Sequence, residues 1–199
     1  MNLSAVAGKA STWAKGPTPE THAAWKTALA LAEKLDDKEI RLQAHYGLWL
    51  YYLRTGELDK ALEHAQSMCE LARSISDEEA MATGLRILGV SLHFLGRHYV
   101  GRDYLQQSLD WYEHGELSHS FRFGLDQESA GQAFLSRLLW LQGEYKAAKQ
   151  MAWRGVKKAA RLQHVCSLCC ALAEGACMTA ALDRNPRWVI KAANWLIHL

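Results

Sequence analysis

The chain has 199 residues, a formal net charge of +2, 49% hydrophobic residues and only three prolines. This near-neutral charge gives no general attraction to nucleic acid or to a membrane surface, and the apolar content predicts ordered structure. We expect no run that approaches the about 18 uncharged apolar residues of a spanning helix. The first residues lack the basic and apolar regions of a secretory signal. Five cysteines in a chain of this size favour a reducing, cytoplasmic setting.

Glycines recur along the chain at a regular spacing. Gly16, Gly56 and Gly96 are 40 residues apart, and Gly143 follows after a longer interval. Each glycine ends one helix-patterned stretch and opens another, which is the signature of stacked helical repeats. At the end of a helix the chain often adopts the left-handed conformation, which costs glycine least. We therefore predict left-handed turns at these four positions.

The predicted elements are helices in antiparallel pairs, because apolar residues recur with a period near 3.6. In chain order the predicted helices span 2–14, 19–35, 37–54, 57–74, 77–95, 98–112, 127–142, 144–162, 165–182 and 186–199. Asp36 and Ser76 each precede a glutamate by three residues, which is the spacing of a capping box. Thr18 and Asn185 each precede a proline, which suits the first helical position. These residues are predicted to begin their helices.

One repeat is longer than the others because of segment 113–126. Burying Phe121 and Phe123 would stabilise this segment by about 1.5–3 kcal/mol for each ring. Alternation along the chain would then point Arg122 the other way, toward a binding groove or toward Asp126. We predict that the segment folds back to form a pocket wall. The alternative is a longer turn that only caps the gap between repeats.

The final predicted helix stops on an apolar run, without the polar capping unit that normally closes a repeat array. We therefore expect a single helical-repeat domain, 1–199, that is a fragment of a longer chain. It divides into five helix pairs: 1–35, 36–75, 76–126, 127–163 and 164–199. The final helix is expected to leave four apolar side chains uncovered, which favours a homodimer through this helix. They are Trp188, Ile190, Trp195 and Leu196.

Four cysteines and one histidine gather in the predicted helix 165–182 and just before it. Cys166, Cys169, Cys170 and Cys177 with His164 could hold a zinc ion. However, they lie in one helical pattern, and cysteine also packs as a small buried hydrophobe. Packing is the favoured interpretation, with metal or redox use as the alternative. The sequence has no phosphate loop and no His-Glu-x-x-His motif, so we expect no catalytic residue, no metal and no cofactor.

The predicted helix 144–162 is basic along one side. Its cations oppose a single acid, Glu144, and its apolar residues occupy the other side. The cations are Lys146, Lys149, Arg154, Lys157, Lys158 and Arg161. The favoured interpretation is a solvated outer helix, and the alternative is a phosphate-binding surface.

Helix pairs with small residues at set positions resemble tetratricopeptide repeats. The small residues concerned are Ala61, Gly89, Gly101, Ser136 and Ala148. Longer runs, including 46–49 and 121–127, look like the helical-repeat region of large bacterial signal-transduction ATPases and of winged-helix, adenylate-cyclase-like transcriptional regulators. The resemblance implies an all-α, right-handed superhelix of tetratricopeptide-like antiparallel helix pairs. It also implies the sensor or regulatory segment of a larger protein.

In such a fold the first helix of each pair lines a concave groove. The groove residues expected to contact a ligand or partner are Tyr46, Arg86, His93, Arg122, Arg137 and Trp140. Arginines and aromatic rings suit a protein or peptide partner, or a small anionic ligand. We expect a non-enzymatic binding module, with a free-standing adaptor as the alternative. Contact with nucleic acid is less favoured, and no membrane partner is expected.

Overall fold

The computed structural model describes residues 12, 16–113 and 120–198. The chain forms two compact units, Met1–Leu95 and Gly96–Leu199. Almost all of the predicted helix 2–14 lies outside the described residues. Within the described ranges every regular element is helical, which confirms the all-α prediction.

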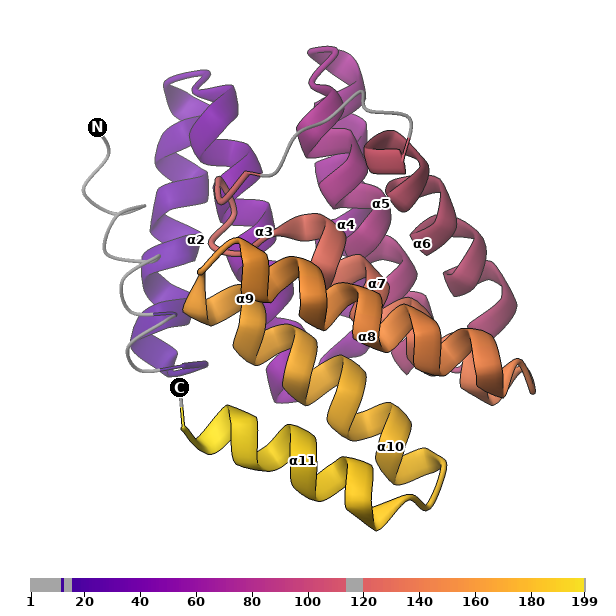
Figure 1. Ribbon diagram of the computed structural model, residues 1–199. Helices are drawn as coiled ribbons and strands as arrows, with labels where there is room; N and C mark the ends of the chain where they lie inside the picture. The colour runs from indigo at the N-terminus through magenta and orange to yellow at the C-terminus, as the bar shows by residue number, and fades with distance from the viewer. Residues whose placement is uncertain (1–11, 13–15, 114–119, 199) are drawn as a thin grey trace. The chain divides into compact units, whose positions relative to one another are not determined.

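The first unit contains four described helices, drawn in indigo to magenta in Figure 1. They are α2 (Pro19–Lys34), α3 (Lys38–Thr55), α4 (Leu58–Ser74) and α5 (Glu78–Phe94). Each helix packs on the next one along the chain. The buried ring of Trp25 lies so close to Gly47 that a Cβ there would be 2.2 Å from Trp25 Cε2. The missing side chain of Gly47 therefore allows α2 to pack on α3.

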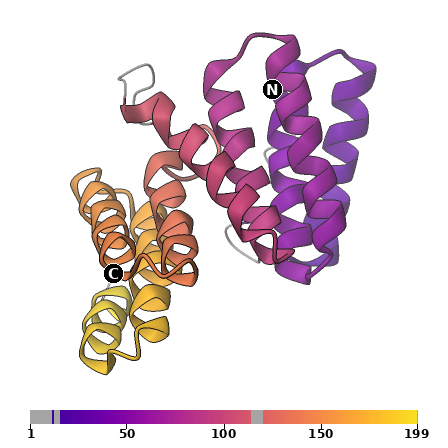
Figure 2. The same cartoon turned by 90° about the vertical axis from the view of Figure 1, so that its right-hand side faces the viewer.

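The second unit is built around one deeply buried helix. Its elements are α6 (His98–Glu113), α7 (Gln127–Leu141), α8 (Tyr145–Arg161), α9 (Val165–Cys170), the π-helix η1 (Ala171–Cys177), α10 (Met178–Leu182) and α11 (Pro186–Ile197). α7 packs against α6, α8 and η1, and α11 packs against η1. Every residue of α7 up to Leu139 is buried. Figure 2 shows α7 to α11, in orange to yellow, stacked side by side.

The turn glycines adopt the predicted conformation. Gly16, Gly56, Gly96 and Gly143 have φ angles of 75°, 82°, 79° and 85°. At Gly56, Gly96 and Gly143 the left-handed backbone lies in the turn between two helices, and at all four glycines nothing lies within 4 Å of the place where a Cβ would be. The backbone conformation therefore explains these glycines, whereas packing explains Gly47.

Two predicted helix caps are wrong by one residue. Asp37 and Asp77 are the N-caps, and their carboxylates accept the amides of Ile40 and Ala80. The preceding residues Asp36 and Ser76 take left-handed φ angles of 53° and 54° to complete the turn. A residue in that conformation cannot serve as an extended N-cap, so the cap moves one position along. The predicted caps Thr18 and Asn185 are confirmed.

Segment Val165–Leu182 corrects the expectation that no stretch could span a membrane. It is the one helical segment in the described ranges that is long and apolar enough, by length and composition. In this fold its central part packs against α7, α8 and α11. Near its middle Glu174 forms an ion pair with Arg137 at 3.0 Å. The segment was also expected to be a regular α-helix, but the hydrogen bonds of η1 widen it between Ala171 and Cys177.

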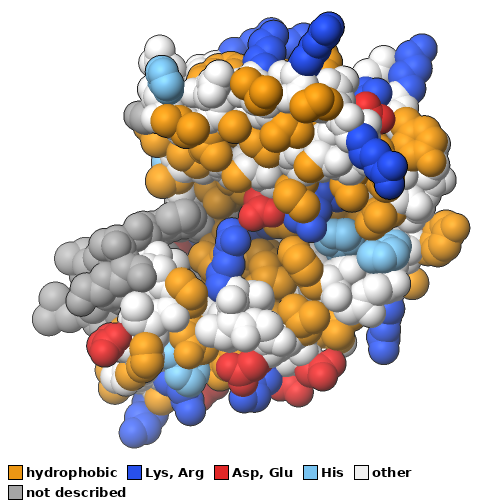
Figure 3. Space-filling view, turned by 90° about the horizontal axis from the view of Figure 1, so that it is seen from below, with side chains coloured by type: hydrophobic (Ala, Val, Ile, Leu, Met, Phe, Trp, Pro, Cys, Tyr) orange, Lys and Arg blue, Asp and Glu red, His pale blue; other side chains and the backbone are white. Residues whose placement is uncertain are grey.

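The final helix α11 exposes most of the apolar side chains expected there. Trp188, Ile190 and Trp195 are 43%, 58% and 38% exposed. Leu196 was expected to be uncovered, but it packs against the buried cluster formed by α8, α9, η1 and α11. α11 is the lowest helix in Figure 1, and Figure 3 shows hydrophobic side chains gathered on the face seen from below.

Candidate functional site

Three predicted groove residues lie in the first unit. Arg86 on α5 donates through Nη2 to Tyr46 Oη on α3 at 3.3 Å. Its guanidinium carbon also lies 5.3 Å from the centre of the Trp49 ring. Tyr46, Arg86 and His93 are only 6%, 2% and 6% exposed. His93 lies about two turns farther along α5, where its ring is 5.2 Å from that of Phe94.

Two further groove residues lie on α7 in the second unit. Arg137 donates through Nη1 to Glu174 Oε2 of η1 at 3.0 Å, and both side chains are largely buried. Its guanidinium carbon lies 5.4 Å from the centre of the Phe134 ring. Trp140 is half-buried, with its ring 5.3 Å from that of Tyr145. Its indole N–H meets no acceptor among the described residues.

Segment 113–126 is anchored as predicted at the end that the structure describes, while 114–119 lie outside the described residues. Phe123 is 4% exposed, and Phe121 stacks on His164 with ring centres 4.1 Å apart. The prediction that Arg122 points away from both rings is wrong, because its guanidinium carbon lies 5.1 Å from the centre of the Phe123 ring. The attraction between a cation and the face of an aromatic ring explains this position. Asp126 caps α7 instead.

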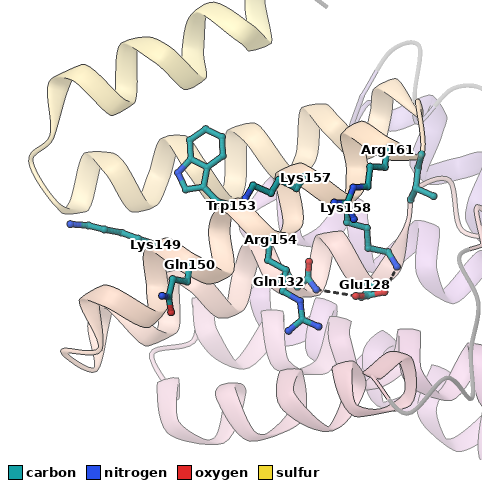
Figure 4. A pocket seen from close by; sticks show the side chains of 10 residues that line it. Glu128, Gln132, Lys149, Gln150, Trp153, Arg154, Lys157, Lys158 and Arg161 are labelled. Carbon is teal, nitrogen blue, oxygen red and sulfur yellow. Dashed lines mark hydrogen bonds and ion pairs between the residues drawn. The ribbon is translucent and has the colours of Figure 1, made fainter.

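A concave basin of about 800 Å³ lies along α8 and the start of α7 (Figure 4). We call it the α7–α8 basin. It is lined by Glu128, Gln132, Lys149, Gln150, Trp153, Arg154, Lys157, Lys158, Arg161 and Leu162. The volume falls in the range typical of ligand pockets, ~300–1,000 Å³. Five of the lining residues are cations and one is an acid.

The basin forms because two helices approach closely at a glycine. A Cβ on Gly155 of α8 would lie 3.1 Å from the Ser129 carbonyl oxygen of α7. This contact brings α8 against the first turns of α7, where Glu128 and Gln132 lie one turn apart. Sequence reasoning identified the basic side of α8 but missed these two α7 residues. Only the packing of the two helices places them beside the cations.

Histidines form a hydrogen-bonded cluster in the first unit. The Nδ1 atoms of His45 and His64 are 3.0 Å apart, and the His64 ring stacks on Tyr52. Burial lowers the pKa of His45 to about 4, and the nearby His64 and Arg41 add to this effect. Burial also lowers the pKa of His64 to about 4. Both rings are therefore neutral at pH 7, and one can donate while the other accepts.

The cysteine stripe lies within the packed part of the second unit. Cys166, Cys169, Cys170 and Cys177 are all half-buried. Burial raises the pKa of the Cys169 and Cys177 thiols, which lowers their reactivity because the thiolate is the nucleophile and the metal ligand. In the part of the chain that the structure describes, no three metal-binding side chains come together. His164 instead caps α9 and contacts Ser167.

The fold is similar to that of several solved repeat proteins. BtubC from P. vanneervenii is 16% identical, with a TM-score of 0.64, and the match covers 96% of this chain and 76% of that one. A second structure contains TPR-like repeats of a Podosopora anserina kinesin light chain, and these repeats are nearly identical to one another. It is 14% identical to this chain, with a TM-score of 0.63, and the match covers 98% of this chain and 92% of that one. These similarities establish a tetratricopeptide-like α-α solenoid, as predicted.

A third similar structure belongs to a much larger protein. It is a signal transduction ATPase with numerous domains (STAND) from Pyrococcus horikoshii, which has a tetratricopeptide repeat sensor. It is 17% identical, with a TM-score of 0.63, and the match covers 98% of this chain but 29% of that one. No family model and no curated protein matches the sequence. Identities this low establish the fold alone.

Proposed function

We propose that this chain is a non-enzymatic binding module that holds a protein or peptide partner, or a small anionic ligand. The tetratricopeptide-like stacking of helix pairs supports this proposal, because such arrays present extended binding surfaces. The proposed contact residues are Tyr46, Arg86, His93, Arg122, Arg137 and Trp140. Of these, Arg122 and Trp140 are the more accessible, so we assign direct contact to them. The four buried residues would hold the surface in shape.

We further propose that the module is the cytoplasmic sensor or regulatory segment of a larger signal-transduction ATPase or transcriptional regulator. The observation that carries this proposal is the match of 98% of the chain to part of a STAND protein with a repeat sensor. The sequence resemblance to bacterial regulators of the winged-helix and adenylate-cyclase-like type supports the same role.

The complete open reading frame, followed by an assay of its product, tests the sensor role. We expect a nucleotide-binding domain in the same chain and a rate of ATP hydrolysis that changes when residues 1–199 are deleted. Arg122→Ala should alter the regulated rate, whereas Arg97→Ala, at an exposed turn position, should not. An open reading frame that encodes no further domain would refute this role, and so would a rate of ATP hydrolysis that the deletion does not change.

A free-standing adaptor is the second candidate. It is favoured by the two solved structures in which the matched repeats make up most of the chain, 76% and 92%. An open reading frame limited to these repeats would support the adaptor. Saturable binding of one purified partner, weakened by Trp140→Ala, would then establish it.

A further inference from the structure

We propose that the α7–α8 basin binds a small, hydroxyl-bearing phosphate monoester. The inference deepens the proposed function, since it names the chemistry of an anionic signal and locates its site. This site, along α8 and the start of α7, is separate from Arg122 and Trp140, to which direct contact is assigned above. Some charges of the basin are already paired, and the others set which ligand it can bind.

Among the described residues, Glu128 is the one acid that lines the basin, and its carboxylate is already bonded. Lys158 forms an ion pair with Glu128 Oε2, and Gln132 donates through Nε2 to Glu128 Oε1 at 3.0 Å. Figure 4 shows these three side chains joined in a chain. Glu128 is 8% exposed. Because both of its oxygens are occupied and its charge is paired, Glu128 does not repel an incoming anion strongly.

Two other cations of the basin have acid partners on neighbouring elements. Lys149 pairs with Asp183 at 2.7 Å, and Arg154 pairs with Glu113 of α6 at 2.7 Å. These pairs engage the charged ends of both side chains. They leave the positive charge of the basin concentrated at one place on α8.

That place is formed by Lys157 and Arg161. Both are exposed, both line the basin, and neither has an ion-pair partner among the described residues. They lie four positions apart on one helix, so their Cβ atoms are about 6 Å apart on the same face. A single compact group can therefore contact both side chains.

A phosphate monoester fits this pair better than other anions do. It carries a charge of about −1.5 to −2 at pH 7 and three acceptor oxygens, and the planar guanidinium of an arginine can bind two of these oxygens at once. A carboxylate has only one charge to share between two cations. Nucleic acid needs phosphate contacts over a longer surface, where Lys149 and Arg154 are already paired. The remaining volume and the exposed amide of Gln150 suit a hydroxyl-bearing body.

Isothermal titration of the 199-residue protein with glycerol 3-phosphate, at constant ionic strength, tests the proposal. Two comparison ligands are titrated separately. One is inorganic phosphate, and the other is glycerol, with sodium chloride added to match the ionic strength. We expect one saturable site for glycerol 3-phosphate, weaker binding of inorganic phosphate, and no heat from glycerol. The double variant Lys157→Ala/Arg161→Ala should lose at least about tenfold in affinity, since each charge-assisted contact is strong.

The matched control is Lys146→Ala/Arg187→Ala, which removes one lysine and one arginine from exposed positions outside the basin. This variant should bind glycerol 3-phosphate like the original protein, and both variants should show its helical circular dichroism. Absence of saturable binding, or equal losses in the two variants, would overturn the proposal. So would binding of a single-stranded oligonucleotide that glycerol 3-phosphate does not displace. Because the assay needs no output domain, a site can be found even if the sensor role is refuted.

Discussion

Arg86 donates a hydrogen bond to Tyr46 across a sequence separation of 40 residues, which is the spacing of the turn glycines. The two residues therefore occupy the same position in successive repeats. In the second unit Arg102 donates to Gln142 at 2.7 Å, but the turn glycines Gly96 and Gly143 are 47 residues apart there, so these two residues are not equivalent. In the first unit the equivalent positions Tyr46 and Arg86 meet because consecutive helices stack on one another.

Replacing Arg86 by alanine should destabilise the protein. The change removes a side chain that is 2% exposed and leaves the Tyr46 hydroxyl without this donor. We expect the free energy of unfolding in urea to fall by about 2–4 kcal/mol, as for other losses of large buried side chains. Lys26→Ala, at an exposed position, should change it by less than about 0.5 kcal/mol. Equal effects of the two substitutions would contradict the buried role of Arg86.

Gly47→Ala should also be costly, because the new Cβ would lie 2.2 Å from Trp25. Overpacking of this kind costs about 1–3 kcal/mol. Trp25→Leu vacates part of that space, so the double variant should be more stable than the sum of the two single losses predicts. Urea unfolding of all four proteins measures the coupling. Strict additivity would show that the ring and the glycine do not constrain each other.

Stability should fall as the pH is lowered from about 6.5 toward 4. The folded-state pKa of His45, about 4, lies below the ordinary histidine value of 6.5 because the ring is buried. The unfolded chain therefore binds more protons in this window, and acid favours unfolding. The loss attributable to His45 is up to about 3 kcal/mol, since one pKa unit corresponds to about 1.4 kcal/mol. His45→Gln should flatten the dependence. An unchanged slope in His45→Gln would count against this assignment.

The exposed apolar side chains of α11 should promote self-association. We expect concentration-dependent dimers in sedimentation experiments, because burying such a surface is favourable. Ile190→Glu, at a position that is 58% exposed, should shift the equilibrium toward monomer. Val165→Glu, 55% exposed on α9, is the control. A strict monomer at high concentration, or equal effects of both substitutions, would refute association through α11.

The cysteine stripe should be packing rather than a metal site. Elemental analysis of protein purified without added zinc should find well under one equivalent of metal. Cys177→Ala should then affect stability only slightly, because alanine keeps the small apolar volume. Stoichiometric zinc that resists chelators would show that the stripe binds metal.

Local signals in the sequence determined the helix positions and the repeat spacing of this protein. Left-handed glycines such as Gly56, and cap residues such as Thr18 and Asn185, act on the adjoining turn, so their effect can be predicted without knowing the fold. The cap at Asp37 was missed by one residue for a reason that is also local. Nothing in the sequence marked Asp36, which is not a glycine, as left-handed.

Only the tertiary structure decided which side chains are available and which charges are paired. Arg86 and Arg137 were expected to face a ligand, but Arg86 donates to Tyr46 and Arg137 pairs with Glu174. The basic pattern of α8 was visible in the sequence. The ion pair between Lys158 and Glu128 was not visible there, because that contact depends on how closely α7 approaches α8 at Gly155. Burial and pairing join residues distant in the chain, whereas helix periodicity and capping act over only a few positions.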